Sequence, residues 1–211
     1  MAGADSFHAQ IRGRGGHGAL PHLAADPVVT AAHGIMALQS IVSRNLSPLE
    51  SAVISVTQLQ AGQAVNIIPD DVSVSGTIRT FSTPVRDLVL NRVERILVET
   101  AEMMDCEATL SFEQMSKPVN NNPAITERLA VLIENIAPDL SCRRDFRTLA
   151  AEDMAFFLEE VPGTFFLVGS ANPERRLNYP HHHPRFDFDE KALEIGAAVM
   201  ASAVADYVLP D

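Results

Sequence analysis

The chain has 211 residues, 46% of them hydrophobic, and a formal net charge of −11. This length allows one or two domains with a buried core. The negative charge excludes nucleic acid and anionic membrane surfaces from the expected partners, because both require a basic protein face. No apolar run approaches the roughly 18 residues that cross a bilayer, and the N-terminal segment has no secretory signal pattern. Cys106 and Cys142 form no disulfide or zinc-knuckle pattern, so we expect a cytoplasmic protein.

The first predicted element is a strand at residues 5–12, where apolar and polar side chains alternate as in a strand buried on one face. A glycine-rich loop at residues 13–18 follows the strand. Asp26-Pro27 then predicts a helix start, with aspartate as the N-cap and proline in the first helical position. The apolar stripe that we expect this helix to bury consists of Val28, Ala32, Ile35, Leu38 and Val42.

Two further strands are predicted at residues 51–60 and 71–80, the second by a clean alternation of apolar and polar side chains. A second helix begins at Thr83-Pro84, and a last strand covers residues 107–114. The order is therefore β-α-β-β-α-β, a ferredoxin-like α+β arrangement with both helices on one face of the sheet. We assign it to a first domain at residues 1–116.

The remaining residues, 117–211, have the pattern of one part of an α/β domain. Helices are predicted at residues 123–136 and 189–207, with a short helix from residue 151 and one strand at residues 164–169. A single strand makes no sheet, yet helices with apolar faces need a partner layer. The sequence therefore predicts that the layer completing this second domain is missing from the chain.

The most prominent group of potential metal ligands is His181-His182-His183, which precedes a proline. Imidazole is the commonest side-chain metal ligand, but a zinc site needs three or four ligands. A solvated loop with adventitious metal affinity therefore explains the cluster equally well. His17 stands between glycines that allow a ligand to approach closely, although an ordinary exposed loop histidine is the simpler interpretation.

Three further features have both a functional and a structural interpretation. Asn66 either bonds the backbone of its own turn or points its amide at an oxyanion. Arg79, on the polar face of a strand, either clamps a carboxylate or is a solvated surface arginine. Glu152 and Asp153 are best explained as acids at a helix start, where the helix dipole stabilises negative charge.

Six stretches together resemble one family, the M20 peptidases, and within it the branch of hippurate hydrolases and of N-acyl-amino-acid and auxin-conjugate amidohydrolases. They follow the family's order and span nearly the whole chain. The six stretches are residues 13–22, Asp26-Pro27, 66–70, 76–81, 151–154 and 182–189.

The resemblance implies an α/β catalytic domain that binds two divalent metal ions (Zn, Mn, Co or Ni), interrupted by a lid domain that forms a homodimer. By this resemblance, residues 1–116 are the lid and residues 117–211 are the C-terminal segment of the catalytic domain. The family's other metal ligands and its general base find no counterpart in this chain. We therefore expect the chain alone to retain no metal pair and to be inactive.

The resemblance also assigns roles to four residues. His17 is expected to reach the partner's active site and stabilise the oxyanion, and Asn66 to contact the substrate there. Arg79 is expected to hold the free carboxylate of an N-acyl amino acid, and His182 to be the last metal ligand. We expect the three lid side chains to converge over one active centre.

Two other functions remain open at this point. The chain could be a non-catalytic dimerisation module or truncated remnant, because a free sheet edge can pair across a two-fold axis. It could also be a metal carrier that uses His181, His182 and His183, although no further ligands converge on them in the sequence.

Overall fold

The computed structural model describes residues 1–209, and these form two compact units. The first unit contains Met1–Val119 and Arg147–Phe157, and the second contains Asn120–Phe146 and the chain from Leu158 on. The return of residues 147–157 to the first unit has no signal in the sequence; there, the amide of Ala2 donates to the carbonyl of Thr148 at 3.1 Å. No helix in residues 1–209 is long and apolar enough to cross a membrane.

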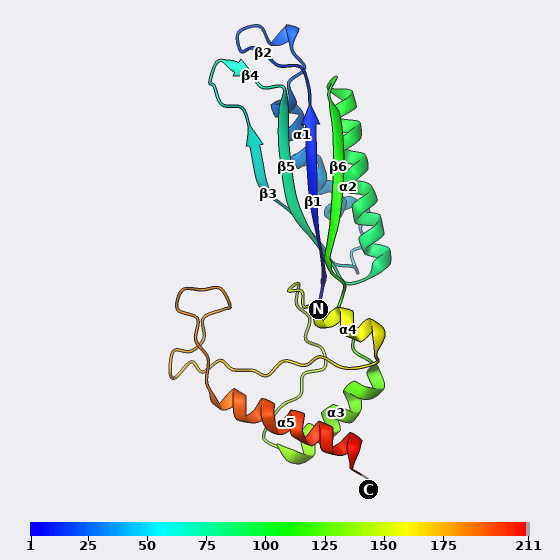
Figure 1. Ribbon diagram of the computed structural model, residues 1–211, viewed down its shortest axis with the longest axis vertical. Coiled ribbons are helices and arrows are strands. Elements are labelled where there is room, and N and C mark those ends of the chain that lie inside the picture. Colours follow the sequence, from blue (N-terminus) through cyan, green and yellow to red (C-terminus); the bar gives the residue numbers. More distant parts are fainter. Residues whose placement is uncertain (210–211) are drawn as a thin grey trace. The chain divides into compact units, whose positions relative to one another are not determined.

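The first unit is a four-stranded antiparallel sheet with two helices on one of its faces (Figure 1). The strand order is β3-β5-β1-β6, and the order along the chain confirms the predicted ferredoxin-like arrangement. The sheet strands are β1 (Gly3–Arg12), β3 (Ala52–Ala61), β5 (Asp71–Thr80) and β6 (Glu107–Ser116). The other elements are β2 (Gly16–His17), a 3-10 turn η1 (Pro21–Leu23), α1 (Pro27–Ser40), a π-helical turn η2 (Ile41–Asn45), β4 (Ile67–Ile68) and α2 (Thr83–Met103).

The alternation read from the sequence decides which side of the sheet is buried. Phe7 and Ile11 of β1 are at most 2% exposed, as are Val72, Val74 and Ile78 of β5. Against them pack Val89, Val93 and Leu97 of α2. The opposite face carries serine, threonine and glutamine and has no helix over it. The strands therefore form a sheet with one face in the core and one open face.

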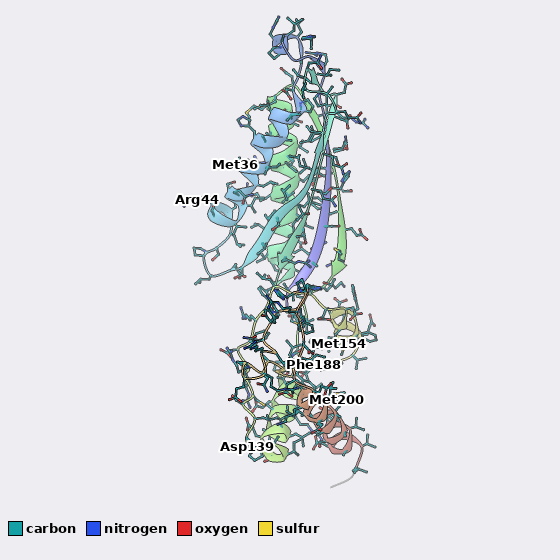
Figure 2. The ribbon with its side chains drawn as sticks, turned by 90° about the vertical axis from the view of Figure 1, so that its left-hand side faces the viewer. Met36, Arg44, Asp139, Met154, Phe188 and Met200 are labelled. Carbon is teal, nitrogen blue, oxygen red and sulfur yellow. The ribbon has the colours of Figure 1, made fainter. Side chains whose placement is uncertain are left out.

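The predicted apolar stripe of α1 is wrong in part. Asp26 is the N-cap as expected, and its carboxylate accepts from the amides of Val28 and Val29. Val28 and Val42, however, are exposed. The buried residues are Pro27, Thr30, Ala31, Gly34 and Leu38. The helix has apolar side chains on two faces and the unit covers only one; Met36, on the side turned away from the sheet (Figure 2), is 72% exposed.

Between residues 117 and 209 the structure contains three helices, α3 (Pro123–Ile136), α4 (Met154–Glu160) and α5 (Lys191–Val208). The strand predicted at residues 164–169 is wrong, because no neighbouring strand is present to pair with it. The side chain of Asn121 takes the place of such a neighbour. Its amide nitrogen donates to the Phe165 carbonyl at 2.8 Å, and its oxygen accepts from the Phe165 amide at 2.9 Å.

A buried ion pair joins β1 to α2 in the first unit. Asp5 lies on the core side of β1 with a side chain only 1% exposed, and Arg86 donates to both of its oxygens at 2.6 to 3.0 Å. Hydrogen bonding to this carboxylate raises the pKa of Arg86 above its ordinary value. The geometry satisfies the buried charge, so the pair orients the start of α2 on the sheet.

Replacing Asp5 by alanine is expected to destabilise the first unit by about 3–5 kcal/mol. The guanidinium of Arg86 would remain largely buried but would have lost the carboxylate that neutralises its charge. Chemical denaturation followed by circular dichroism measures the loss. Asp87→Ala is the control, since Asp87 is exposed and only 3.6 Å from the same guanidinium. An Asp5→Ala variant as stable as the Asp87→Ala variant would contradict this role.

Candidate functional site

Two loops that are far apart in the sequence lie side by side at one end of the sheet (Figure 1). They are the His17 loop, residues 13–18 between β1 and η1, and the Asn66 loop, residues 62–70 between β3 and β5. Inside them β2 pairs with β4, so that His17 stands opposite Ile67. The Gly18 amide donates to the Asn66 carbonyl at 2.8 Å. The structure therefore brings His17 and Asn66 together, as expected.

A hydrogen bond to one ring nitrogen of His17 leaves the other ring nitrogen as a hydrogen-bond donor. The amide of Ala19 donates to its Nδ1 at 3.0 Å, so this nitrogen is unprotonated and the neutral ring carries its proton on Nε2. His17 is exposed. The outer nitrogen can therefore give a hydrogen bond to an oxygen atom that approaches the loop.

The side chain of Asn66 is also available for such an oxygen. Asn66 is exposed, and its amide has no hydrogen-bond partner among residues 1–209. The structural interpretation, in which the amide would bond its own turn, is not realised. The two paired loops therefore expose two side-chain N–H donors, the imidazole of His17 and the amide of Asn66, which are groups of the kind that can stabilise an oxyanion.

Arg79 lies elsewhere, and the expectation that it converges with His17 and Asn66 is wrong within one chain. It pairs with Ala4 of β1 and Val53 of β3, at the end of the sheet remote from the two loops. Arg79 lies eight residues beyond Asp71 on β5, which is about 26 Å at a rise of about 3.3 Å per residue. Sequence reasoning placed Arg79 on the correct face but had no measure of this separation.

The histidine cluster lies in a loop whose aromatic contacts distinguish its three members. His181 packs edge-on against Phe186 at 4.8 Å, and His183 stacks on Tyr179 at 4.4 Å. His182 has neither contact, and its backbone adopts a φ of 68°, the left-handed region that non-glycine residues rarely enter. Nδ1 of His183 accepts from the Arg185 amide at 3.0 Å, whereas the ring nitrogens of His181 and His182 have no hydrogen-bond partner within residues 1–209.

The donor set around His182 does not fit a complete metal centre. No group of three or more histidine, cysteine, aspartate or glutamate side chains within residues 1–209 is arranged to hold a metal ion. His182 can supply one ligand, and a two-metal site needs several more from outside these residues. Glu152 and Asp153 precede α4, where their carbonyls accept from Ala155 and Phe156, in agreement with the helix-start interpretation.

A shallow groove of about 500 Å³ lies beside this loop in the second unit. Its lining is mostly apolar, and one wall is formed by the extended residues 164–169, which have no strand partner among residues 1–209. The residues that line it include Val168, His181, Phe186, Phe188, Leu193 and Ala197. In a complete α/β domain a surface of this composition would be covered by another layer.

Asp189 anchors the end of the histidine loop. Its carboxylate accepts from the side chain of Asn172 at 2.6 Å and from the amide of Lys191 at 3.2 Å, and Arg175 is 3.3 Å away. These contacts lower the pKa of Asp189, the hydrogen bond from Asn172 most strongly. Sequence reasoning gave Asp189 no role, although an acid after a histidine-rich turn and just before a helix was the available signal.

The comparisons with known proteins bear on these two units. Residues 2–104 match the family model of the peptidase dimerisation domain of the M20 type. The chain belongs to the M20 peptidase family. It is 36% identical over 195 residues to an N-acetyl-L-cysteine deacetylase of Bacillus subtilis. It is 34% identical over 213 residues to the IAA-amino acid hydrolase ILR1-like 4 of Arabidopsis thaliana.

Solved structures agree with this assignment. The M20 chain superposes with a TM-score of 0.79 and 25% identity on YxeP of Bacillus subtilis, described as a dinuclear metal-binding peptidase of the M20 family. The superposition covers 99% of this chain and 51% of YxeP. The alignment with the deacetylase covers 92% of this chain and 45% of the deacetylase. The alignment with the IAA-amino acid hydrolase covers 99% of this chain and 48% of the hydrolase. The M20 chain thus spans about half the length of the relatives it matches.

Acid is expected to release the histidine loop of this M20 chain. Because the pKa of Asp189 is below its ordinary value of 3.8, its bonds contribute above that value and are lost as the pH falls through the lowered pKa. Amide exchange of residues 172–189 measures the release, and Asp189→Ala should show it at neutral pH. Asp139→Ala, an exposed acid in the same unit, is the control. If the amides of residues 172–189 are equally protected from exchange in both variants, Asp189 does not anchor the loop.

Proposed function

We propose that the chain is the lid and C-terminal part of a metal-dependent amidohydrolase that cleaves the amide bond of N-acyl amino acids. The observation that carries the proposal is the pairing of β2 with β4, which joins the His17 loop to the Asn66 loop, each with an exposed side chain that can donate a hydrogen bond. The names of two relatives, an N-acetyl-L-cysteine deacetylase and an IAA-amino acid hydrolase, support this substrate class.

The three lid residues have distinct roles in the proposal. His17 and Asn66 donate to the oxyanion that forms when the amide carbon becomes tetrahedral, a stabilisation that a preorganised donor provides best. Arg79 holds the free carboxylate of the amino acid through its guanidinium, which converts binding into alignment of the amide. The two loops and Arg79 are too far apart on one lid to meet one small substrate. One substrate therefore takes its oxyanion donors from one copy of the lid and its carboxylate clamp from the other.

The metals of the proposed enzyme, two divalent ions of Zn, Mn, Co or Ni, need more ligands than this chain provides. His182 is the ligand that the described residues offer, and it lies in the second unit. In that unit the apolar groove and the extended residues 164–169 have no neighbouring layer of secondary structure to cover or pair with them within residues 1–209. The polypeptide that supplies the remaining ligands would also supply that layer. Cys106 and Cys142 are both free, which suits the cytoplasm as the proposed compartment.

A homodimer is the second element of the proposal, and β3 is the edge strand best suited to form it. β3 has ten residues without a charge or a proline, whereas the other edge strand, β6, carries Glu107 and Glu113. Charges blunt an edge, and a long uncharged edge invites pairing with another strand. Beside β3, α1 exposes Val28 and Met36 to extend an apolar contact. Such pairing would join two sheets across a two-fold axis.

The competing interpretation, a non-catalytic dimerisation module, uses the same surface but gives no reason for a donor histidine and a free asparagine at the far end of the sheet. The histidine metal carrier is less well supported. Nδ1 of His183 already accepts a hydrogen bond from the Arg185 amide, and no group of three or more potential ligands gathers around the cluster within residues 1–209.

The test of the hydrolase is His17→Ala in an enzyme that joins this sequence to a metal-bearing N-terminal half. The loss of one oxyanion donor should lower kcat on hippurate about 10²–10³-fold and leave the metal content unchanged. His8→Ala, on the open face of the sheet, is the control. The 211-residue chain alone should not hydrolyse hippurate with any of the four metals; turnover by it, or full activity of His17→Ala, would contradict the proposal.

The test of the dimer is a charge at the centre of the exposed face of α1. Met36→Glu should convert a dimer, twice the 22.9 kDa chain mass, into a monomer in light scattering, because a carboxylate cannot be buried there without a partner. Met103→Glu is the matched control, since Met103 is equally exposed at 71% but ends α2. If both variants stay dimeric, the interface lies elsewhere.

A further inference from the structure

The His17 loop is shaped by backbone contacts that leave no room for side chains. A Cβ atom on Gly13 would lie 2.1 Å from the Ala25 carbonyl oxygen, and one on Gly15 would lie 2.5 Å from the Ile68 carbonyl oxygen. Glycine is therefore required at both positions. The loop is therefore placed mainly by hydrogen bonds. Arg14 bonds to Ala25 and Leu23 on one side, and further bonds come from the Asn66 loop.

Asp70 supplies two of these bonds from the far end of the Asn66 loop. Its carbonyl oxygen accepts from the Gly13 amide at 2.8 Å, and its carboxylate Oδ1 accepts from the Gly15 amide at 2.8 Å. Among residues 1–209, no other side chain bonds the backbone of Gly13, Gly15 or Gly18. The bond to Gly15 is charge-assisted, which makes it about twice as strong as a neutral one.

Asn66 is coupled to the same clamp. Three residues separate it from Asp70, and two of them form β4, which bonds to β2. Its carbonyl accepts from the Gly18 amide. The two ends of this short segment thus hold the two ends of the His17 loop, Asp70 at Gly13 and Gly15, and Asn66 at Gly18. A shift of either loop would change the distance between the two candidate donors.

We infer that Asp70 is a positioning residue: its carboxylate sets the place of the His17 loop against the Asn66 loop, and with it the direction of the Nε2–H donor. The Ala19 amide decides which nitrogen of His17 carries the proton, and Asp70 holds the backbone at Gly13 and Gly15, just before the residue from which that ring projects. This inference rests on the proposed function of His17 and Asn66 for its catalytic meaning, but the clamp itself is a property of this chain.

Nuclear magnetic resonance of the 211-residue chain tests the clamp without any catalysis. In Asp70→Ala, exchange of the Gly15 amide should become about tenfold faster or more, the equivalent of one lost charged hydrogen bond. The imidazole nitrogen signals of His17 and its contacts with Ile67 should change with it. Asp70→Asn should restore much of both, because its side-chain oxygen can still accept from Gly15.

Asp71→Ala is the matched control, since Asp71 is the next residue and accepts from the Gln10 side chain, away from both glycines. Amide exchange at Val93 and Leu97 reports whether the core remains folded. Unchanged Gly15 exchange and His17 signals in Asp70→Ala, or equal changes in Asp71→Ala, would overturn the inference. If the clamp is present but His17→Ala leaves hydrolysis intact, the hydrolase proposal fails and the clamp stands.

Discussion

The antiparallel pairing of β1 with β5 is the constraint on which the rest of the first unit depends. The two strands pair without interruption from Gly3 opposite Thr80 to Arg12 opposite Asp71. Because the strands leave the sheet at the same end, the loop after β1 and the loop before β5 must meet there. The register therefore brings the His17 loop and the Asn66 loop to one place, and a slip of either strand by one residue would also turn its apolar side chains out of the core.

The same pairing explains why Arg79 is separated from the other two residues. A ten-residue strand is long compared with a small substrate, so residues at its two ends cannot act on one molecule. Within a single chain this arrangement makes little chemical sense. It becomes coherent when two copies are present, because the end of one sheet can then serve the neighbour. The proposed function therefore depends on the proposed dimer.

Much of the fold followed from local sequence patterns, and the failures have physical causes. Alternation in β5 and the Asp26-Pro27 start of α1 were read correctly because both signals act within a few residues. The stripe of α1 was misread because two apolar faces compete in one helix. Residues 164–169 have strand character without a partner. The clamp by Asp70 and the pair of Asp5 with Arg86 join residues 55 and 81 positions apart, and no periodicity reports such contacts.

Asn121 has a consequence for how the second unit meets other polypeptides. A carboxamide presents one acceptor and one donor, the same two groups that an adjacent β-strand offers to a single residue. By occupying both backbone groups of Phe165, it leaves a chain with strand character satisfied rather than bare. An incoming strand would have to exchange these bonds one for one. These two bonds therefore disfavour nonspecific strand pairing at Phe165. A partner could displace them only by offering hydrogen bonds along a whole strand.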